Sequence, residues 1–187
     1  MEDPIIISNL NDFGFCPASI YFHNLMYGAD RILTQTSSQI NGTHSHFSID
    51  NGSYSSRKSV FQGLEVYSEE YGLIGKIDIY YADKGLLVER KKKVSKLFDS
   101  QIFQIYGQYF AMCEMGYDVR ELRIYSMDDN RNYSIPLPED DAELFNSFCN
   151  VVSDMHAFNL DTFKQDNPLK CANCIYEVMC SCSVKEV

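Results

Sequence analysis

The sequence predicts a mixed α/β domain, and three observations support this fold class. Strand-like segments begin near residue 60, and two of them flank a tight turn at residues 82–85. Two helical segments follow at residues 99–115 and 139–158, and the second has apolar side chains at helical spacing. The chain of 187 residues has the length of one domain with a substantial core. Because no repeat or linker divides it, residues 1–187 are expected to form a single domain.

The N-terminal part combines a helix signal with a long loop signal. Residues 19–27 predict a short helix that follows Cys16 and Pro17. Residues 34–57 are rich in Ser, Thr, Asn and Gly, which favours loop structure. His46 lies in this stretch, and we expect it near the start of a short helix.

Two hairpins are expected, one on each side of the first long helix. That helix is predicted to begin with Asp99 as its N-cap and to stop at Gly116. The tail from residue 166 onward is expected to be irregular. The predicted hairpin strands are residues 75–81 with 86–91, and residues 119–127 with 132–137.

The charge distribution is uneven. The formal net charge of −10, from 16 basic and 26 acidic residues, argues against a general nucleic-acid binder. The basic strip, residues 90–93 with Lys96, is a local exception that suits contact with DNA or a partner. A solvated charged edge is the simpler interpretation of such a run. No apolar run has the length of a membrane helix, and the acidic start lacks a secretory signal, so a cytoplasmic protein without membrane contact is expected.

The first hairpin predicts that two carboxylates meet. If Tyr81 pairs with Leu86 across the turn, Asp78 lies directly opposite Glu89, with Cβ atoms about 4.5–5.5 Å apart. Two carboxylates so placed repel each other, and a divalent cation between them would remove the repulsion. Lys91 lies two residues beyond Glu89 and therefore points to the same face.

These residue types favour metal-assisted hydrolysis of a phosphodiester. A metal acidifies a bound water and neutralises charge that develops on the phosphate. On this register Lys76 is expected opposite Lys91, and Ile79 opposite Val88 on the core face. The alternative is an exposed strand edge on which the two lysines neutralise the two acids. A slip of one residue in the register would place the acids on opposite faces.

The cysteines predict a metal or iron–sulfur site that closes the C-terminal end. Cys171, Cys174 and Cys180 lie within ten residues, and Cys16 stands far upstream next to a proline. Three close thiolates and one distant one make the four that tetrahedral zinc or an iron–sulfur cluster requires. Cys182 could replace Cys180 as a ligand, and the sequence leaves zinc and iron–sulfur open.

Taken together, the motifs resemble those of the CRISPR-associated RecB-like exonuclease family (Cas-four), over nearly the whole chain. No single motif is specific, but their order and separation are. The markers are Cys16-Pro17 followed by Ile20-Tyr21, Gly42-x3-His46, Gly75-x2-Asp78, Glu89-x-Lys91, a helix bearing Gln104, and the three C-terminal cysteines.

The resemblance implies a restriction-endonuclease-like fold of the RecB nuclease type, a mixed sheet flanked by helices. The nuclease core would span residues 40–140, and a 4Fe-4S cluster would join residues 10–25 to residues 165–185. The implied cluster ligands are Cys16, Cys171, Cys174 and Cys180.

The resemblance also implies a catalytic site and a biological role. Mg²⁺ or Mn²⁺ would be held by His46, Asp78, Glu89 and the backbone carbonyl of Arg90, with Lys91 and Gln104 assisting. The implied activity is a DNA exonuclease that trims or selects fragments for integration as new CRISPR spacers, in adaptation and antiviral defence. The implied partners are DNA, as single strands or frayed ends, and the CRISPR integrase proteins.

The sequence departs from the family at one position and leaves other functions open. The family's helix often reads Gln-x3-Tyr, whereas here Gln108 follows Gln104 and Tyr109 stands next to it. One alternative is an adaptor subunit that binds DNA ends or motifs for the integrase, with weak or partner-dependent cleavage. A third reading is a redox or regulatory iron–sulfur protein without nuclease chemistry.

Overall fold

A computed structural model describes residues 3–25, 55 and 57–184 of the chain. Of the predicted loop over residues 34–57, residues 34–54 and 56, which include His46, lie outside the described residues. In chain order the elements are β1 (Ile5–Ile6), α1 (Asn9–Phe15), α2 (Pro17–Leu25), β2 (Val60–Gln62), β3 (Glu65–Ser68), β4 (Leu73–Lys76), β5 (Ile79–Tyr81), β6 (Leu86–Lys91), α5 (Asp99–Glu114), β7 (Glu121–Ser126), β8 (Arg131–Ile135), α6 (Ala142–Ala157), α7 (Pro168–Ala172) and a 3-10 turn at Glu177–Met179.

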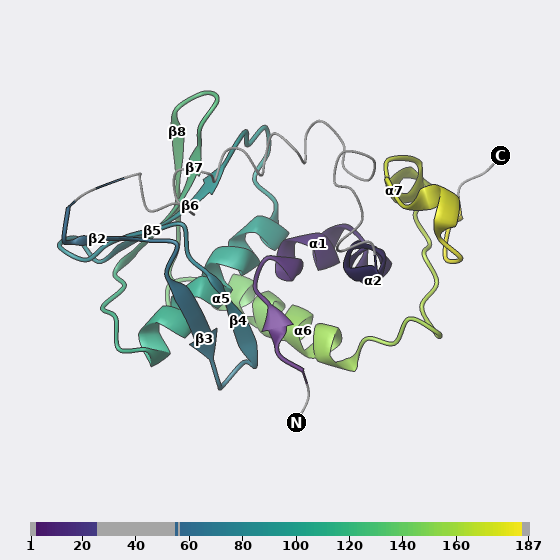
Figure 1. Cartoon of the computed structure of the whole chain (residues 1–187), viewed down its shortest axis with the longest axis horizontal. Helices are drawn as coiled ribbons and strands as arrows, with labels where there is room; N and C mark the ends of the chain where they lie inside the picture. Colours follow the sequence, from purple (N-terminus) through teal and green to yellow (C-terminus); the bar gives the residue numbers. More distant parts are fainter. Residues whose placement is uncertain (1–2, 26–54, 56, 185–187) are drawn as a thin grey trace.

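The strands form two mixed sheets with helices packed on them, which confirms the mixed α/β prediction (Figure 1). One sheet has three strands in the order β1-β4-β3, and the other has five in the order β2-β5-β6-β7-β8. β1 runs parallel to β4 and β6 parallel to β7, whereas the remaining neighbours are antiparallel. Helix α5 contacts strands of both sheets and so lies where the sheets meet. Within the described residues, no helix is long and apolar enough to cross a membrane.

The first predicted hairpin has the expected register. Tyr81 pairs with Leu86 and Ile79 pairs with Val88, and the buried Ile79 and Val88 face a small apolar cluster as expected. β6 is mostly buried, because it lies between β5 and β7 in the interior of the five-stranded sheet. The second hairpin is confirmed as β7 and β8.

The prediction of one strand over residues 75–81 is wrong. The segment is divided at residues 77–78 into β4 and β5, which belong to different sheets. The pairing register with the preceding segment is nevertheless unchanged, since Glu65 pairs with Lys76 and Gln62 with Ile79. One long antiparallel pair therefore bends and passes from one sheet into the other.

Backbone hydrogen bonds hold this bend. The N–H of Ile77 donates to the carbonyl of Leu64 at 3.0 Å, and the N–H of Gly63 donates to the carbonyl of Asp78 at 3.2 Å. Gly63 has a φ of +60°, a conformation that glycine adopts without a Cβ penalty. The bend consequently places Asp78 at the junction of the two sheets.

The two long helices occur close to where they were predicted. Asp99 is the first helical residue of α5 and not its N-cap, which is Phe98. The side chain of Gln101 accepts the Phe98 N–H at 3.1 Å and so caps this end. Gly116, with a φ of +85°, follows the end of the helix as expected.

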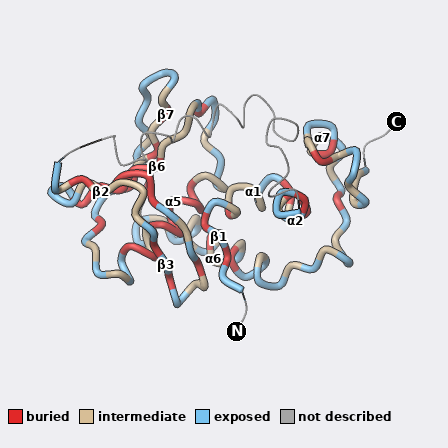
Figure 2. Tube along the Cα trace, in the orientation of Figure 1, coloured by how far each residue is buried: buried red, intermediate tan, exposed pale blue. Residues whose placement is uncertain are grey.

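Besides the cluster around Ile79 and Val88, two separate apolar clusters lie in the described chain, and Figure 2 shows its buried segments. The large one lies between α5, α6 and the sheets, and its fully buried side chains include Tyr106 and Phe148. The small one, at the C-terminal end, has the buried members Cys16, Ala18, Phe22 and Tyr176. The tail that contributes to it is not wholly irregular as predicted, because Asn167 caps the short helix α7 through its side chain.

Candidate functional site

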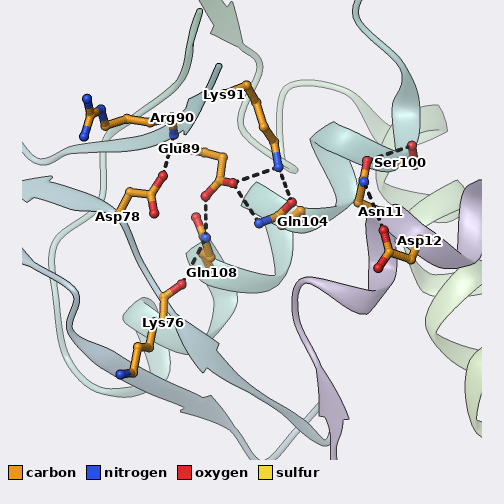
Figure 3. A network of polar contacts seen from close by, with 10 residues as sticks. All are labelled: Asn11, Asp12, Lys76, Asp78, Glu89, Arg90, Lys91, Ser100, Gln104 and Gln108. Atoms are coloured by element: carbon orange, nitrogen blue, oxygen red, sulfur yellow. Dashed lines mark hydrogen bonds and ion pairs between the residues drawn. The ribbon is translucent and has the colours of Figure 1, made fainter. Parts of the chain in front are cut away.

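Asp78 and Glu89 lie in one cleft, as the hairpin register predicts. This cleft, of about 1010 Å³, is also lined by Lys91 and Gln104. Asp78 follows the bend directly, one residue beyond the last pair of the β5–β6 ladder, and its Oδ2 accepts the backbone N–H of Arg90 at 2.7 Å. Glu89 comes from the interior strand β6 (Figure 3). Two acids, a lysine and an amide therefore come together from the bend, strand β6 and helix α5.

Three donors hold the carboxylate of Glu89. Its Oε1 contacts Lys91 Nζ at 2.9 Å and accepts from Gln104 Nε2 at 2.7 Å. Its Oε2 accepts from Gln108 Nε2 at 2.8 Å. The Oε1 of Gln104 in turn accepts from Lys91 Nζ at 2.6 Å, so the lysine, the glutamate and the first glutamine form a closed ring of contacts (Figure 3).

Of Gln108 and Tyr109, the two residues at the departure from the family pattern, Gln108 is the one that contacts Glu89. Gln104 and Gln108 are four residues apart on α5 and therefore lie on the same helical face. Both are buried, and both donate to Glu89. The hydroxyl of Tyr109 points elsewhere and donates to Glu139 at 3.3 Å. Sequence reasoning identified Gln104 but assigned no contact to Gln108.

Glu89 is buried in a place that disfavours its charge. Only 2% of the residue is exposed, and this burial raises the pKa of Glu89 above its ordinary value. The neighbouring negative charge of Asp78 raises that pKa further, whereas Lys91 and the Gln108 hydrogen bond lower it. Desolvation and like charge therefore act together against the ionised pair.

The donor set suits a hard divalent cation. With both acids ionised and Lys91 protonated, the group carries one net negative charge in a partly desolvated setting, which a cation would offset. A carboxylate has roughly four acceptor positions. Three donors contact the carboxylate of Glu89, which leaves about one position for a cation. Asp78 and Glu89 would thus supply oxygen ligands, and other ligands must come from elsewhere. The predicted ligand His46 lies outside the described residues, and the Arg90 carbonyl remains a prediction.

The prediction that Lys76 stands opposite Lys91 is wrong. Lys76 ends β4, where its ladder partner is Glu65 of β3, and its Nζ lies 3.6 Å from the Glu65 carboxylate. Figure 3 shows its side chain directed away from Glu89. The reason is the bend, because β4 leaves the sheet that contains β6. Lys91 is therefore the lysine that reaches the acids.

The basic strip is not one continuous surface. Lys91 turns into the cleft, and the guanidinium of Arg90 contacts the sulfur of Met127 at 2.9 Å. Lys93 and Lys96 are exposed, and Lys96 lies over the ring of Phe98 at 5.4 Å. Alternation along a strand sends successive side chains to opposite faces, so a run of like charges in sequence is divided in space.

The N-terminal helix α1 supplies a wall of the cleft that the sequence did not reveal. Asn11 and Asp12 both line the cleft. Burial raises the pKa of Asp12, whereas Asn11, His23 and Lys91 lower it. A helix signal in residues 9–15 was missed because the element is short and contributes one fully buried apolar side chain, Leu10.

The outer face of the three-stranded sheet lines the same cleft with exposed apolar side chains. Ile6 pairs with Ile74, and Ile74 pairs with Tyr67, which forms a row across three strands. These side chains are 44%, 41% and 51% exposed, respectively. A solvated sheet face usually carries polar residues. An exposed apolar row beside the acids is instead typical of a surface that binds a ligand or partner.

The structure brings the predicted cysteines together. Cys16 of the N-terminal region and Cys171, Cys174 and Cys180 of the tail line one small cavity of about 20 Å³. Cys182 lines it too, so the choice between Cys180 and Cys182 stays open. Burial raises the pKa of Cys174, and the neighbouring thiols of Cys16 and Cys171 raise it further. Thiols from both ends of the chain therefore line one cavity, and thiolate sulfur is the ligand type that zinc and iron–sulfur sites use.

Gln165 is a further residue of the cysteine site that the sequence did not indicate. It is buried, and its Nε2 donates to Cys16 Sγ at 3.1 Å. Its Oε1 accepts the backbone N–H groups of Asp166 and Asn167, which orients the amide. Hydrogen bonds to ligating sulfurs are one way in which proteins tune such centres.

The described side chains do not by themselves complete a metal centre. Among residues 3–25, 55 and 57–184, no group of three or more His, Cys, Asp and Glu side chains has the arrangement of a ligand set. For the acid site, the predicted third side-chain ligand is His46, outside this part of the chain.

Comparison with known proteins gives a likeness in fold. No protein-family model matches the chain, and no curated protein sequence is similar to it. A solved structure, the crystal structure of SSO0001, is similar with a TM-score of 0.61 and 16% sequence identity. The match covers 98% of this chain and 89% of that chain. At this identity, the likeness concerns the fold alone.

Proposed function

We propose that this chain is a metal-dependent deoxyribonuclease of the restriction-endonuclease-like, RecB type. One observation carries the proposal: Asp78, Glu89 and Lys91 converge in one cleft, and a cation would offset the repulsion between the acids. A bound Mg²⁺ or Mn²⁺ would supply an acidified water and neutralise charge on the phosphate.

The side chains around the proposed metal have separable roles. Asp78 and Glu89 would bind the ion through their oxygens. Lys91 is held at Glu89 and Gln104, and its ammonium group lies where it could contact a phosphate oxygen or the attacking water. Gln104 would orient the lysine. The finer proposal is an exonuclease that prepares DNA for CRISPR spacer integration, and it rests on the sequence motifs that resemble the Cas-four family.

Cleavage by an isosteric variant tests the catalytic proposal. Asp78→Asn keeps an oxygen that can accept the Arg90 N–H but removes the charge that would bind the cation. We expect Mn²⁺-dependent cleavage of single-stranded DNA to fall at least about 100-fold, since even outer-shell partners of metal ligands often contribute 10–100-fold. Asp83→Asn, in the exposed turn of the same hairpin, is the matched control and should retain full activity. Equal cleavage by Asp78→Asn and wild type would refute the assignment.

A single-stranded substrate is the proposed class, because the apolar row offers a surface on which unpaired bases can stack. Stacking of a base on an aromatic side chain contributes about 1–3 kcal/mol. Tyr67 is the aromatic member of the row and is half exposed. Tyr67→Ala should therefore raise KM for single-stranded DNA by about 5–150-fold with kcat nearly unchanged, whereas Tyr67→Phe should match wild type. A Tyr67→Ala variant with the wild-type KM would remove this surface from the proposal.

A second candidate function is an adaptor that holds DNA ends for an integrase. The net charge of −10 favours it, because an isolated nuclease would gain from a broader positive field than the divided basic strip provides. Purified wild type that never cleaves with Mn²⁺, together with an Asp78→Asn variant that equals wild type within the assembled complex, would support the adaptor over the enzyme.

A further inference from the structure

Gln108 links the two segments that carry the acids. It is 1% exposed on α5, and its Nε2 donates to Glu89 Oε2 at 2.8 Å and to the backbone carbonyl of Lys76 at 3.3 Å. These two acceptors account for both hydrogens of the amide nitrogen. One side chain is therefore bonded to a strand of each sheet (Figure 3).

The second contact lies next to the bend. Lys76 is the last residue of β4, two residues before Asp78, and the chain changes sheets between them. Because the β5–β6 ladder ends at the Ile79–Val88 pair, Asp78 itself lies one residue beyond the ladder. Its position relative to Glu89 depends on the bend, on the contact of its carboxylate with the Arg90 N–H, and on helix α5, which contacts β4 and β6.

Gln104 does not connect these segments in the same way. Its amide contacts Glu89 Oε1 and Lys91, which both belong to β6. Gln104 consequently orders the lysine within one strand, whereas Gln108 connects β6 to the end of β4. Both glutamines are buried and contact Glu89, but Gln108 is the one that also contacts β4.

We propose that Gln108 is a positioning residue that fixes the separation of Asp78 and Glu89 and thereby makes the site selective for small divalent cations. The inference rests on the proposed function, in which these acids bind a metal. Mg²⁺ requires nearly octahedral geometry at about 2.0–2.1 Å, whereas Ca²⁺ accepts longer and more flexible coordination. Because Mg²⁺ demands nearly fixed ligand positions and Ca²⁺ tolerates movable ones, loss of the Gln108 contacts should weaken Mg²⁺ binding more than Ca²⁺ binding.

Removing the amide tests this role. Gln108→Met has a similar volume and donates no hydrogen bond, and Gln101→Met is the matched control on the same helix, where the amide caps the Phe98 N–H. Mn²⁺ binding is followed by electron paramagnetic resonance on the full chain, and Mg²⁺ and Ca²⁺ by displacement of Mn²⁺. Gln108→Met is expected to raise the Kd for Mg²⁺ by about 10–100-fold and the Kd for Ca²⁺ by less, so that selectivity shifts toward Ca²⁺.

The outcomes separate the inference from the proposed function. Gln101→Met should bind all three ions as wild type does. If Gln108→Met does not fold, Gln108→Asn is used, since its shorter amide cannot reach both acceptors, and the same shift is expected. Unchanged Mg²⁺ and Ca²⁺ binding, or equal losses for both ions, overturns the selectivity role alone. The proposed function fails, and this inference with it, if wild type binds no Mn²⁺ or if Asp78→Asn binds Mn²⁺ as well as wild type does.

Discussion

The acid site and the cysteine site differ in what holds each of them together. The acids lie on strands and against a long helix of the large apolar cluster, and hydrogen bonds from Lys91, Gln104 and Gln108 position Glu89. The cysteines meet in a small cluster with four buried residues, between the N-terminal region and the tail. Figure 1 shows α7 beside α2, at the end of an extended segment that follows α6. Secondary structure thus preorganises the acid site, whereas the cysteine site lies in a smaller apolar cluster that a bound ligand would reinforce.

Loss of one thiol should have the largest effect. Cys171 is buried in the small cavity, and Cys171→Ser replaces a soft ligand with a hydroxyl that binds zinc or iron poorly. We expect nearly all iron and zinc to be absent from the anaerobically purified variant, and its soluble yield to fall. Cys113→Ser, at an exposed cysteine of α5, is the control and should keep the wild-type metal content. A soluble Cys171→Ser protein with full metal content would contradict the proposed role of Cys171 as a metal ligand.

Chelation of the wild-type protein should loosen the tail and leave the cleft intact. Trypsin can cut after Lys164 and Lys170, which flank the buried Gln165. Without a bound ligand, the small apolar cluster would hold the tail less firmly, and cleavage at these sites should be at least about tenfold faster. Amide exchange in α5 and β6 should change little. Equal loss of protection in α5 would show that the two sites unfold together.

Removal of charge at the acid site should stabilise the metal-free protein slightly. The folded pKa of Glu89 lies above its ordinary value of 4.5, so this group favours folding at low pH and that stability is lost as pH rises through the folded pKa. Asp78→Asn removes one cause of that shift. In chelator at pH 7.5, we expect its free energy of unfolding to rise by about 1 kcal/mol. Denaturant titration measures it, and a less stable variant would contradict the proposed repulsion.

The candidate site was predictable where it depended on neighbours in sequence. A four-residue turn fixes which residues face each other across a hairpin, and the Tyr81–Leu86 pairing followed from it. The placement of Lys76 failed because a bend between two sheets depends on the preceding strand and on Gly63. The fixed spacing of Gln104 and Gln108 on one helical face was visible, but the acceptor that each would meet was not.

The sequence by itself determined the mixed α/β class, both hairpins, the two long helices and the set of cysteines available to a metal, because strand alternation, turn residues and helical periodicity are local properties. The tertiary structure decided that Asp78 stands at a junction of two sheets, that Gln108 and not Tyr109 reaches Glu89, and that Gln165 contacts Cys16. These contacts join residues distant in sequence, and which of them form depends on how all the elements pack at once.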